Sequence, residues 1–334
     1  MFGYEMRDYD LKVYNEEIRD FLPDKIIDTH THVFVEGFSK TSSTWVGKVM
    51  DECTYENLTQ TFLDMLPGKK LKAVMMALPT KDHNIGNAYI EECIKKGGTG
   101  LFCTKYDTPL SAIEEAITKR GFKGIKPYPN NRPSYIPLGE SRIFDFFPHE
   151  HLKLLNELGA VVTLHIGRDM RLKDPVNIHQ LMEIEEKYPN VKLIVAHIGR
   201  AYSPEDLGDA FETLKHTKNM MFDFCANTLS EAMEECLKAV GSKRIMYGTD
   251  MPVTKMRMRR ISEKGIYKNI VPKGLYGDVS GDIHMLETEN EELTCFLYEE
   301  IRAFKKAAEK LNLTKEDISD VFYGNASKIY GIEI

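Results

Sequence analysis

The chain has 334 residues, of which 42% are hydrophobic and 28% charged, a balance that excludes a disordered or fibrous protein. Its 44 basic and 51 acidic side chains give a net charge of −7, so the overall positive charge typical of nucleic-acid-binding proteins is missing. No apolar run approaches the length that spans a bilayer, and segment 1–21 lacks the apolar core of a signal peptide. We therefore expect a cytoplasmic protein that binds neither nucleic acid nor membranes.

Short apolar runs rich in β-branched residues alternate along the chain with amphipathic segments. An N-terminal helix is expected at about 8–22, ahead of the first run. The runs have the composition of strands buried on both faces and cover residues 25–34, 72–79, 100–107, 122–129, 160–167, 192–199, 220–226 and 244–252. Strands that alternate with helices predict crossover connections and a parallel sheet.

Eight such strands favour closure into a barrel. The seven steps from His30 to Asp250 average about 31 residues, close to the roughly 30 residues of a βα unit. A doubly wound sheet is the alternative, but no glycine-rich fingerprint follows the first strand. The sequence therefore predicts an α/β fold, a single-domain (β/α)8 TIM barrel over 1–334. Its core is expected at about 25–252, with a long loop at 253–288 after strand 8 and C-terminal helices at about 288–331.

Polar residues end several of the predicted strands, at the end of a TIM barrel where active sites lie. They are His30 and His32 on strand 1, Lys126 on strand 4, His165 on strand 5, His197 on strand 6 and Asp250 on strand 8. Residues i and i+2 of a strand point to the same side, so His30 and His32 converge. Imidazoles and a carboxylate around one mouth suit a divalent metal, Zn²⁺ first, with Mn²⁺ or Fe²⁺ as alternatives.

Two other features look like ligand sets but are interpreted as structural. His149 and His151 form a second His-X-His pair, but they follow Pro148 at an expected helix start, where residues i and i+2 diverge, so a surface or capping role is expected for them. The six cysteines lie far apart and form no CxxC pair, so reduced, buried thiols are expected.

Six motifs together resemble the amidohydrolase superfamily, and more narrowly its amidohydrolase-2 branch of metal-dependent hydrolases and related decarboxylases. They are DTHTH (28–32), GIKPYP (124–129), TLH (163–165), VAHIG (195–199), GTD (248–250) and YGNASKIYG (323–331). The resemblance implies a (β/α)8 barrel that binds one divalent metal through His30, His32, His165 and Asp250. It also implies that His197 polarises the substrate or takes a second metal.

Lys126 and Asp28 each have more than one interpretation. In some relatives a strand-4 lysine is carboxylated and bridges two metals; Lys126 could equally contact substrate or form an ion pair at the barrel rim. Asp28 shares a face with His30 and His32, so it either hydrogen-bonds an imidazole or has a purely structural role.

Arginines follow both strand-end His-Ile-Gly sequences, and they suggest an anionic substrate. Arg168 and Arg200 could clamp a carboxylate, or pair with Asp169 and Glu205 on the rim. A basic stretch in the strand-8 loop forms either a solvated face, a subunit contact or an anion-attracting wall; it contains Lys255, Arg257, Arg259, Arg260 and Lys264. Further residues that could line the pocket are Tyr128, Arg132 and Trp45.

These observations favour a metal-dependent hydrolase of a small, carboxylate-bearing ester, lactone or amide. Asp250 would accept the proton of a metal-bound water, and His197 would stabilise the developing oxyanion. The first alternative is a metal-dependent decarboxylase or hydratase of an unsaturated or aromatic carboxylic acid. A non-catalytic metal-binding protein is the second alternative, and assembly into a homo-oligomer is left open.

Overall fold

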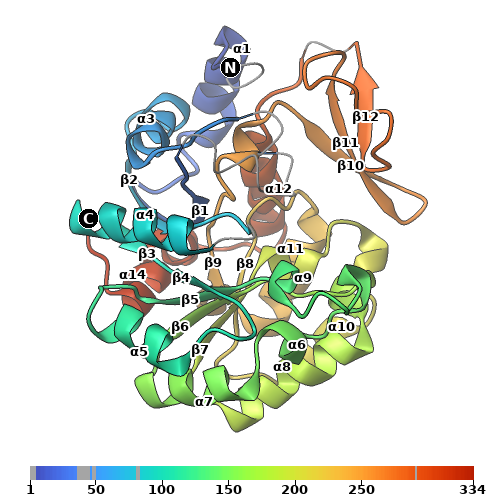
Figure 1. Ribbon diagram of the computed structural model, residues 1–334. Helices are drawn as coiled ribbons and strands as arrows, with labels where there is room; N and C mark the ends of the chain where they lie inside the picture. The colour runs from blue at the N-terminus through green and yellow to red at the C-terminus, as the bar shows by residue number, and fades with distance from the viewer. Residues whose placement is uncertain (1–4, 36–45, 47–49, 80–82, 290–291) are drawn as a thin grey trace.

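Parallel strands occupy the centre of the molecule, and helices surround them (Figure 1). The computed structural model describes residues 5–35, 46, 50–79, 83–289 and 292–334. The parallel strands are β1 (Lys25–His32), β2 (Lys70–Met76), β3 (Thr99–Gly100), β4 (Phe102–Thr104), β5 (Gly124–Pro127), β6 (Val161–Leu164), β7 (Lys192–Val195), β8 (Met221–Asp223) and β9 (Ile245–Met246).

Helices fill most of the connections between these strands. They are α3 (Tyr55–Met65), α4 (His83–Lys95), α5 (Leu110–Thr118), α6 (Ile143–Phe146), α7 (His149–Leu158), α8 (Pro175–Lys187), α9 (His197–Arg200), α10 (Ala210–Leu214) and α11 (Ser230–Val240). The N-terminal helix expected at about 8–22 is shorter, with α1 (Asp8–Val13) continuing into a π-helical turn (Tyr14–Ile18). The C-terminal helices are α12 (Phe296–Lys310), α13 (Lys315–Ser319), a π-helical turn (Asp320–Gly324) and α14 (Asn325–Tyr330).

Local signals in the sequence explain where several helices begin and end. Asp174 caps α8 by accepting hydrogen bonds from the backbone N–H groups of Val176 and Asn177, and Pro175 occupies the first helical position. Gly159 ends α7 in the left-handed conformation, which costs glycine little because it has no Cβ. The alternation of strand and helix predicted from the sequence is therefore confirmed.

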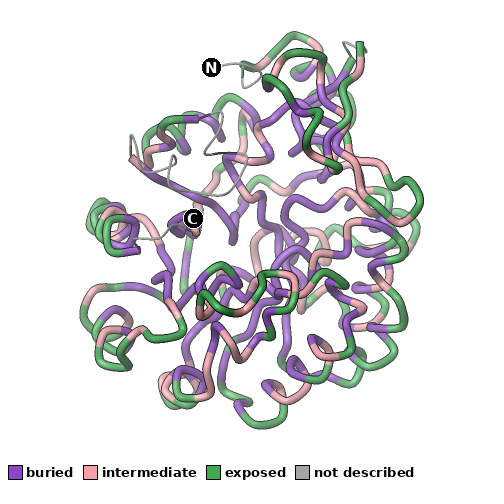
Figure 2. Tube along the Cα trace, turned by 45° about the vertical axis from the view of Figure 1, so that its right-hand side comes forward, coloured by how far each residue is buried: buried purple, intermediate pink, exposed green. Residues whose placement is uncertain are grey.

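Burial is greatest along the strands. Every residue of β5 and β6 is buried, and β1 is buried at seven of its eight positions. In Figure 2 the central trace is mostly purple, while the outer helices alternate between buried and exposed positions. Strands covered on both faces must be apolar at every position, which is why their sequences read as continuous hydrophobic runs.

The parallel strands pair with their neighbours in chain order. One hydrogen-bonded group has the order β1-β2-β3 and the other the order β4-β5-β6-β7-β8-β9, with only Leu101 between β3 and β4. The segment that follows β9 also bonds to β1. The backbone N–H of Thr29 donates to Tyr247 (3.0 Å), that of Asp250 to His30 (2.7 Å), and that of His32 to Met251 (2.7 Å). The α/β fold with parallel strands is confirmed.

The prediction of a long loop over 253–288 is wrong, because much of this segment forms a second, three-stranded sheet, seen apart from the parallel strands in Figure 1. Strands β10 (Arg259–Glu263) and β11 (Ile266–Pro272) form an antiparallel hairpin, and β12 (Met285–Thr288) pairs parallel to β11. Lys264 and Gly265, both with positive φ, make the two-residue turn that such hairpins favour. The next helix therefore begins at Phe296 and not near residue 288.

A buried ion pair joins the N-terminal helix to this segment. The Arg257 guanidinium donates two hydrogen bonds to the Asp10 carboxylate, at 2.8 Å and 2.6 Å. Arg257 thus has a structural role that its place in a basic stretch does not reveal. In the described part of the chain, no helix combines the length and the apolar character needed to cross a membrane.

Candidate active site

The strand-end residues of β1, β5, β6, β7 and β9 surround one cavity of about 150 Å³. Five of its lining side chains were predicted from the sequence: His30, His32, His165, His197 and Asp250. The other lining residues are Leu78, Pro79, Tyr128, Asn130 and Val253. His30 and His32 project from β1 with their ring centroids 5.4 Å apart. The parallel strands thus bring residues from distant parts of the sequence to a common floor.

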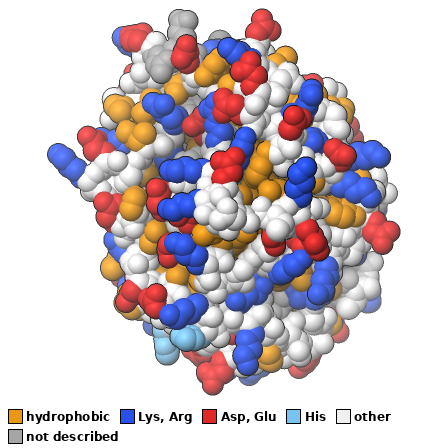
Figure 3. Space-filling model, turned by 180° about the vertical axis from the view of Figure 1, so that it is seen from behind, with side chains coloured by type: hydrophobic (Ala, Val, Ile, Leu, Met, Phe, Trp, Pro, Cys, Tyr) orange, Lys and Arg blue, Asp and Glu red, His pale blue; other side chains and the backbone are white. Residues whose placement is uncertain are grey.

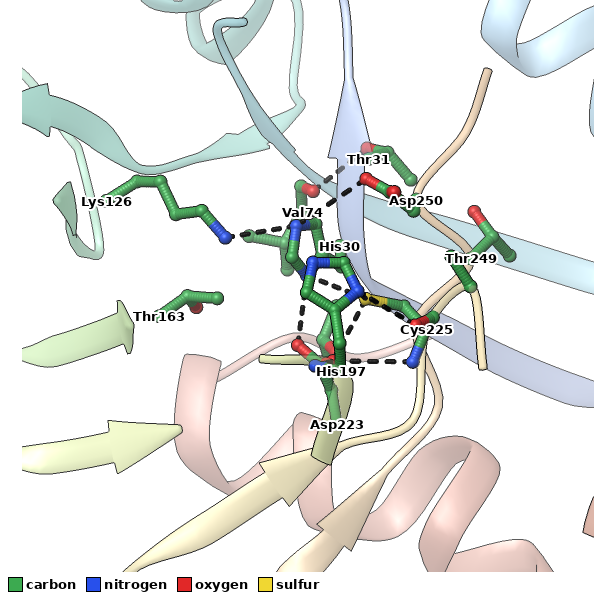
Figure 4. Close-up of polar contacts among 12 residues, drawn as sticks. His30, Thr31, Val74, Lys126, Thr163, His197, Asp223, Cys225, Thr249 and Asp250 are labelled. Atoms are coloured by element: carbon green, nitrogen blue, oxygen red, sulfur yellow. Dashed lines mark hydrogen bonds and ion pairs between the residues drawn. The ribbon is translucent and has the colours of Figure 1, made fainter. Parts of the chain in front are cut away.

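His30 is held by a carboxylate behind it. Its Nδ1 lies 3.0 Å from Oδ2 of Asp223, so Nδ1 carries the proton that the carboxylate accepts. The Nε2 lone pair then points into the cavity, where the Lys126 amine reaches it at 3.0 Å (Figure 4). This arrangement presents the imidazole in the tautomer that a metal requires.

Asp250 lies opposite the β1 histidines. Its Oδ1 is 2.9 Å from Nε2 of His32 and 3.8 Å from Nε2 of His30. The three side chains offer two nitrogens and one oxygen within 4.8 Å of one another, a spacing that a single metal ion can fill. Asp250 has a positive φ of 62°, a strained conformation that its backbone hydrogen bond to His30 helps to hold.

His197 and His165 form the next part of the cavity wall. Their ring centroids are 5.0 Å apart, and the His197 ring lies 4.9 Å from that of His30. Nδ1 of His197 donates to the carbonyl of Cys225 (2.9 Å), and Nε2 has no hydrogen bond to any residue that the structure describes. His165 lines the same cavity but lies outside the group of three ligand atoms formed by His30, His32 and Asp250.

Burial and neighbouring charges shift the pKa values of the cavity histidines and of Asp250. It lowers the pKa of His30 to about 3, with the nearby Lys126 charge adding to the effect, and it lowers the pKa of His165 and His197 as well. Burial alone would raise the pKa of Asp250, but the hydrogen bond from His32 and the nearby histidines outweigh it and lower this pKa to about 2. Neutral imidazoles and an ionised carboxylate are the protonation states in which these side chains bind metals.

Asp223 and Cys225 complete the site and were not among the predicted site residues. Oδ1 of Asp223 accepts the backbone N–H of His197 (2.7 Å), so one carboxylate positions two histidines. The Cys225 thiol lies 3.0 Å from Nδ1 of His30 and 3.1 Å from Nδ1 of His197. A polar residue inside the apolar run 220–226 was the only sequence signal for them.

Among the residues that the structure describes, two groups of side chains have metal-ligand spacing, and they share His30. The second group is His30, His197 and Cys225. In that group Nδ1 of His30 already bonds Asp223, and burial raises the pKa of the Cys225 thiol well above its usual value, which keeps it protonated. The group of His30, His32 and Asp250 therefore fits a divalent metal better, because its donors are two imidazole nitrogens and an ionised oxygen that all face the cavity.

The structure decides between some of the alternatives considered for Lys126, Tyr128 and Asp28. Lys126 is fully buried, no carboxylate of the described residues lies within ion-pair distance of it, and burial lowers its pKa. The Tyr128 hydroxyl donates to the carbonyl of Ala77 (2.9 Å), so it is the ring that faces the cavity. Asp28 accepts from the backbone of His30 and from Thr249, and it bonds no imidazole in the described part of the chain, which agrees with the structural role.

The arginines expected to clamp an anion differ in their surroundings. Arg168 forms an ion pair with Asp174 (2.8 Å), the residue that caps α8, and not with Asp169. Arg200 has no ion pair in the described ranges, and its charge contributes to the low pKa of His165. The pairing with Glu205 considered for Arg200 is absent. Trp45 lies outside the described residues.

The remaining sequence interpretations concern groups outside the cavity. His149 bonds the hydroxyl of Tyr188 (2.8 Å) and His151 the carbonyl of Thr108 (2.8 Å) at the start of α7, so the two rings have different partners. The expected surface or capping role is wrong for His151, because its side chain is buried and bonds a carbonyl outside the helix. All six cysteines are free and buried. Acidic and basic side chains are interspersed over the face drawn in Figure 3, without a broad region of one sign.

Comparison with known proteins identifies the family. The model of the amidohydrolase family, in its amidohydrolase-2 branch, matches residues 27–266, which is most of the chain and includes the whole cavity floor. The chain therefore belongs to the amidohydrolase-2 family, a family of enzymes. No curated protein matches the sequence significantly.

Solved structures share the fold at low sequence identity. A probable 2-pyrone-4,6-dicarboxylic acid hydrolase from Acinetobacter baumannii with bound citric acid is 16% identical (TM-score 0.59; 92% of this chain and 99% of that chain covered). A zinc-bound amidohydrolase from Burkholderia multivorans is 13% identical (TM-score 0.59; 92% and 99%). A manganese-bound 5-carboxyvanillate decarboxylase from Novosphingobium aromaticivorans is 15% identical (TM-score 0.56; 92% and 96%). These likenesses support the fold, while the reaction has to be argued from the site.

Proposed function

We propose that this protein is a metal-dependent hydrolase of small, carboxylate-bearing esters, lactones or amides. The observation that carries the proposal is the group of His30, His32 and Asp250, whose ligand atoms lie within 4.8 Å of one another at the cavity floor. His165 is the proposed fourth ligand, since it lines the same cavity. The proposed metal is one Zn²⁺, with Mn²⁺ or Fe²⁺ as alternatives, because the donors are nitrogen and oxygen.

The proposed architecture is a closed, single-domain (β/α)8 barrel. Three backbone hydrogen bonds between β1 and residues 247–251 support closure on one side, and the single residue between β3 and β4 supports continuity on the other. Closure has a consequence for the chemistry, because it places the ends of β1, β5, β6, β7 and β9 around one mouth.

The chain's own residues divide the catalytic work. When bound, a divalent metal lowers the pKa of a water molecule and polarises a carbonyl. Asp250 is ionised and faces the cavity, so it can accept the proton of the attacking water. His197 presents its free Nε2 to the cavity, provided that Nδ1 keeps its proton on the Cys225 carbonyl. It is therefore the residue proposed to polarise the substrate's carbonyl and to steady the oxyanion.

An anionic substrate is supported by the charge around the cavity. Lys126 and Arg200 are basic side chains of the site region without a carboxylate partner among the described residues, while Arg168 is neutralised by Asp174. Arg200 is accordingly the preferred partner of a substrate carboxylate, with Lys126 and the Tyr128 ring as further proposed contacts. Arg168 remains a weaker candidate for the same role.

A carboxy-lyase is the second candidate. The same Asp250 and His197 could move a proton to or from carbon in a decarboxylase or hydratase of an unsaturated or aromatic acid. The two reactions differ in their products, since only a decarboxylase releases CO₂ and only a hydrolase yields an acid with an alcohol or amine.

The test combines metal content with product analysis. We expect about one divalent metal per chain, as in mononuclear sites of this donor type, and turnover that is lost on chelation and restored by Zn²⁺ or Mn²⁺. A panel of carboxylate-bearing esters, lactones, amides and aromatic acids is assayed for acid release and for CO₂. Asp250→Asn should remove turnover, while the exposed Asp20→Asn should not. Absence of bound metal, or an Asp250→Asn enzyme with substantial activity, would refute the assignment.

A further inference from the structure

Arginines and tyrosines form a cluster beside His197, which we call the arginine–tyrosine wall: Arg171, Tyr202, Arg260 and Tyr267. The Tyr202 ring packs edge-on to the His197 ring with centroids 6.2 Å apart. The guanidinium carbon of Arg260 lies 4.4 Å from the Tyr202 centroid and 4.7 Å from that of Tyr267. A chain of ring contacts therefore connects Arg260 to a residue of the cavity.

The small sheet holds Arg260 in this position. Nε of Arg260 donates to Asn269, its cross-strand partner on β11 (2.9 Å), and Nη1 donates to the carbonyl of Ala226 (2.6 Å). Ala226 follows Cys225 in the loop after β8, so these bonds join the small sheet to the rim of the site. Nη2 makes no hydrogen bond to any described residue, and the Phe296 ring lies 4.8 Å from the guanidinium carbon.

The arginine–tyrosine wall has more hydrogen-bond donors than acceptors. Arg171 pairs with Asp206 (2.7 Å), but its buried Nε has no hydrogen-bond partner among the described residues. Arg260 has no carboxylate within ion-pair distance in the same part of the chain, and the hydroxyl groups of Tyr202 and Tyr267 have no partner there. Unpaired charge that is partly withdrawn from water is unfavourable unless an anion compensates it.

The electrostatics agree with this geometry. Burial lowers the pKa of Arg260, and the neighbouring Arg171 charge lowers it further. Burial raises the pKa of Tyr202, and the charges of Arg260 and Arg200 both oppose that increase. Arg260 and Arg200, from different parts of the chain, thus act on the same tyrosine next to His197.

We propose that Arg260 determines substrate specificity by binding the substrate carboxylate, together with the Tyr202 hydroxyl and Arg200. The planar guanidinium suits a carboxylate, and its stacking between aromatic rings fixes its orientation. The small sheet is then a specificity element of the enzyme and not only a surface insertion. This inference rests on the proposed function for the location of the reacting group at the His30, His32 and Asp250 cluster.

The test uses probes that place one end at the metal cluster. Hydroxamates with two to five methylene groups and a terminal carboxylate are compared with the same compounds ending in a carboxamide, by calorimetric titration of the zinc-loaded enzyme. We expect the wild-type enzyme to prefer the best-fitting acid over its amide by about tenfold or more, as expected for a charge-assisted pair. Arg260→Met should reduce this preference to within threefold.

Control variants separate recognition from folding. Arg259 is the exposed neighbour of Arg260 on β10, so Arg259→Met makes the same change of charge one residue away and should keep the preference. Tyr202→Phe removes only the hydroxyl and should lower the preference without changing Tm.

Two results would overturn the inference. One is an acid-over-amide preference that Arg260→Met leaves unchanged, including the case in which acid and amide binding fall equally; the other is no preference in the wild type. Acid-selective binding that depends on Arg260 in an enzyme without hydrolytic turnover would support this inference while refuting the proposed function.

Discussion

Asp223 is expected to control metal affinity although it does not face the metal cluster. Its two oxygens accept from Nδ1 of His30 (3.0 Å) and from the backbone N–H of His197 (2.7 Å). In Asp223→Asn the amide oxygen must accept the hydrogen bond from the backbone N–H of His197, because a backbone N–H can only donate. The amide NH₂ group then meets Nδ1 of His30, where a donor faces a donor.

His30 can relieve this conflict only by moving its proton to Nε2, which removes the lone pair that a metal needs. Keeping the proton on Nδ1 instead leaves a buried donor unsatisfied, at about 1–3 kcal/mol. Either route should weaken metal binding by about 10- to 100-fold, the range found when carboxylates behind metal-bound histidines are removed. This factor corresponds to about 1.4–2.8 kcal/mol.

The assay is competition for Zn²⁺ between the enzyme and a chromophoric chelator. Asp28→Asn is the matched control, because Asp28 is equally buried beside His30 but bonds its backbone N–H and Thr249. Burial raises the pKa of Asp28 to about 7, so loss of its charge should matter less. We expect near wild-type affinity in the control. A Kd for Asp223→Asn within threefold of wild type would refute the reasoning.

Two further predictions concern stability. Burial raises the pKa of Glu300 well above 4.5, so the folded state binds more protons than the unfolded state and stability falls as pH rises above about 4.5. Glu300→Gln keeps the acceptor for the Ala226 N–H. The Tm of this variant minus the Tm of the wild type should therefore be larger at pH 8 than at pH 5, and the same Tm difference at both pH values would contradict this. Arg257→Met leaves the buried Asp10 unpaired and should cost about 3–5 kcal/mol in urea unfolding, against under about 0.5 for Arg259→Met. A loss below 1 kcal/mol for Arg257→Met would show that the pair is dispensable.

Local patterns were enough to predict the parallel strands and most of the cavity floor. Strands covered on both faces must be apolar throughout, so each polar residue at the end of such a run is conspicuous. Because parallel strands end at the same side of a sheet, His30, His32, His197 and Asp250 could be predicted to meet. This inference needs strand order and direction but no side-chain detail.

The hydrogen-bond and ion-pair partners of charged side chains could not be predicted in the same way. Asp223 lies inside an apolar run, and periodicity does not say that it turns toward His30 across the sheet. Arg168 had a neighbouring acid at Asp169, but the turn before α8 brings Asp174 closer to it. Charged side chains are long and several acids lie within reach, so only the path of the backbone decides which pair forms.

The region after β9 shows most clearly the difference between what the sequence predicts and what the tertiary structure decides. Its sequence carried basic residues that could be interpreted only as a group, whereas the structure gives each a different role. Arg257 is buried against Asp10, Arg259 faces solvent, and Arg260 lies over the rings of Tyr202 and Tyr267. Composition determined that this segment is basic. Only the tertiary structure decided which of these charges packs against Tyr202 and Tyr267. That choice depends on the hairpin turn at Lys264 and Gly265 and on the alternation of faces along β10, and both follow from a strand pairing that the sequence signals only weakly.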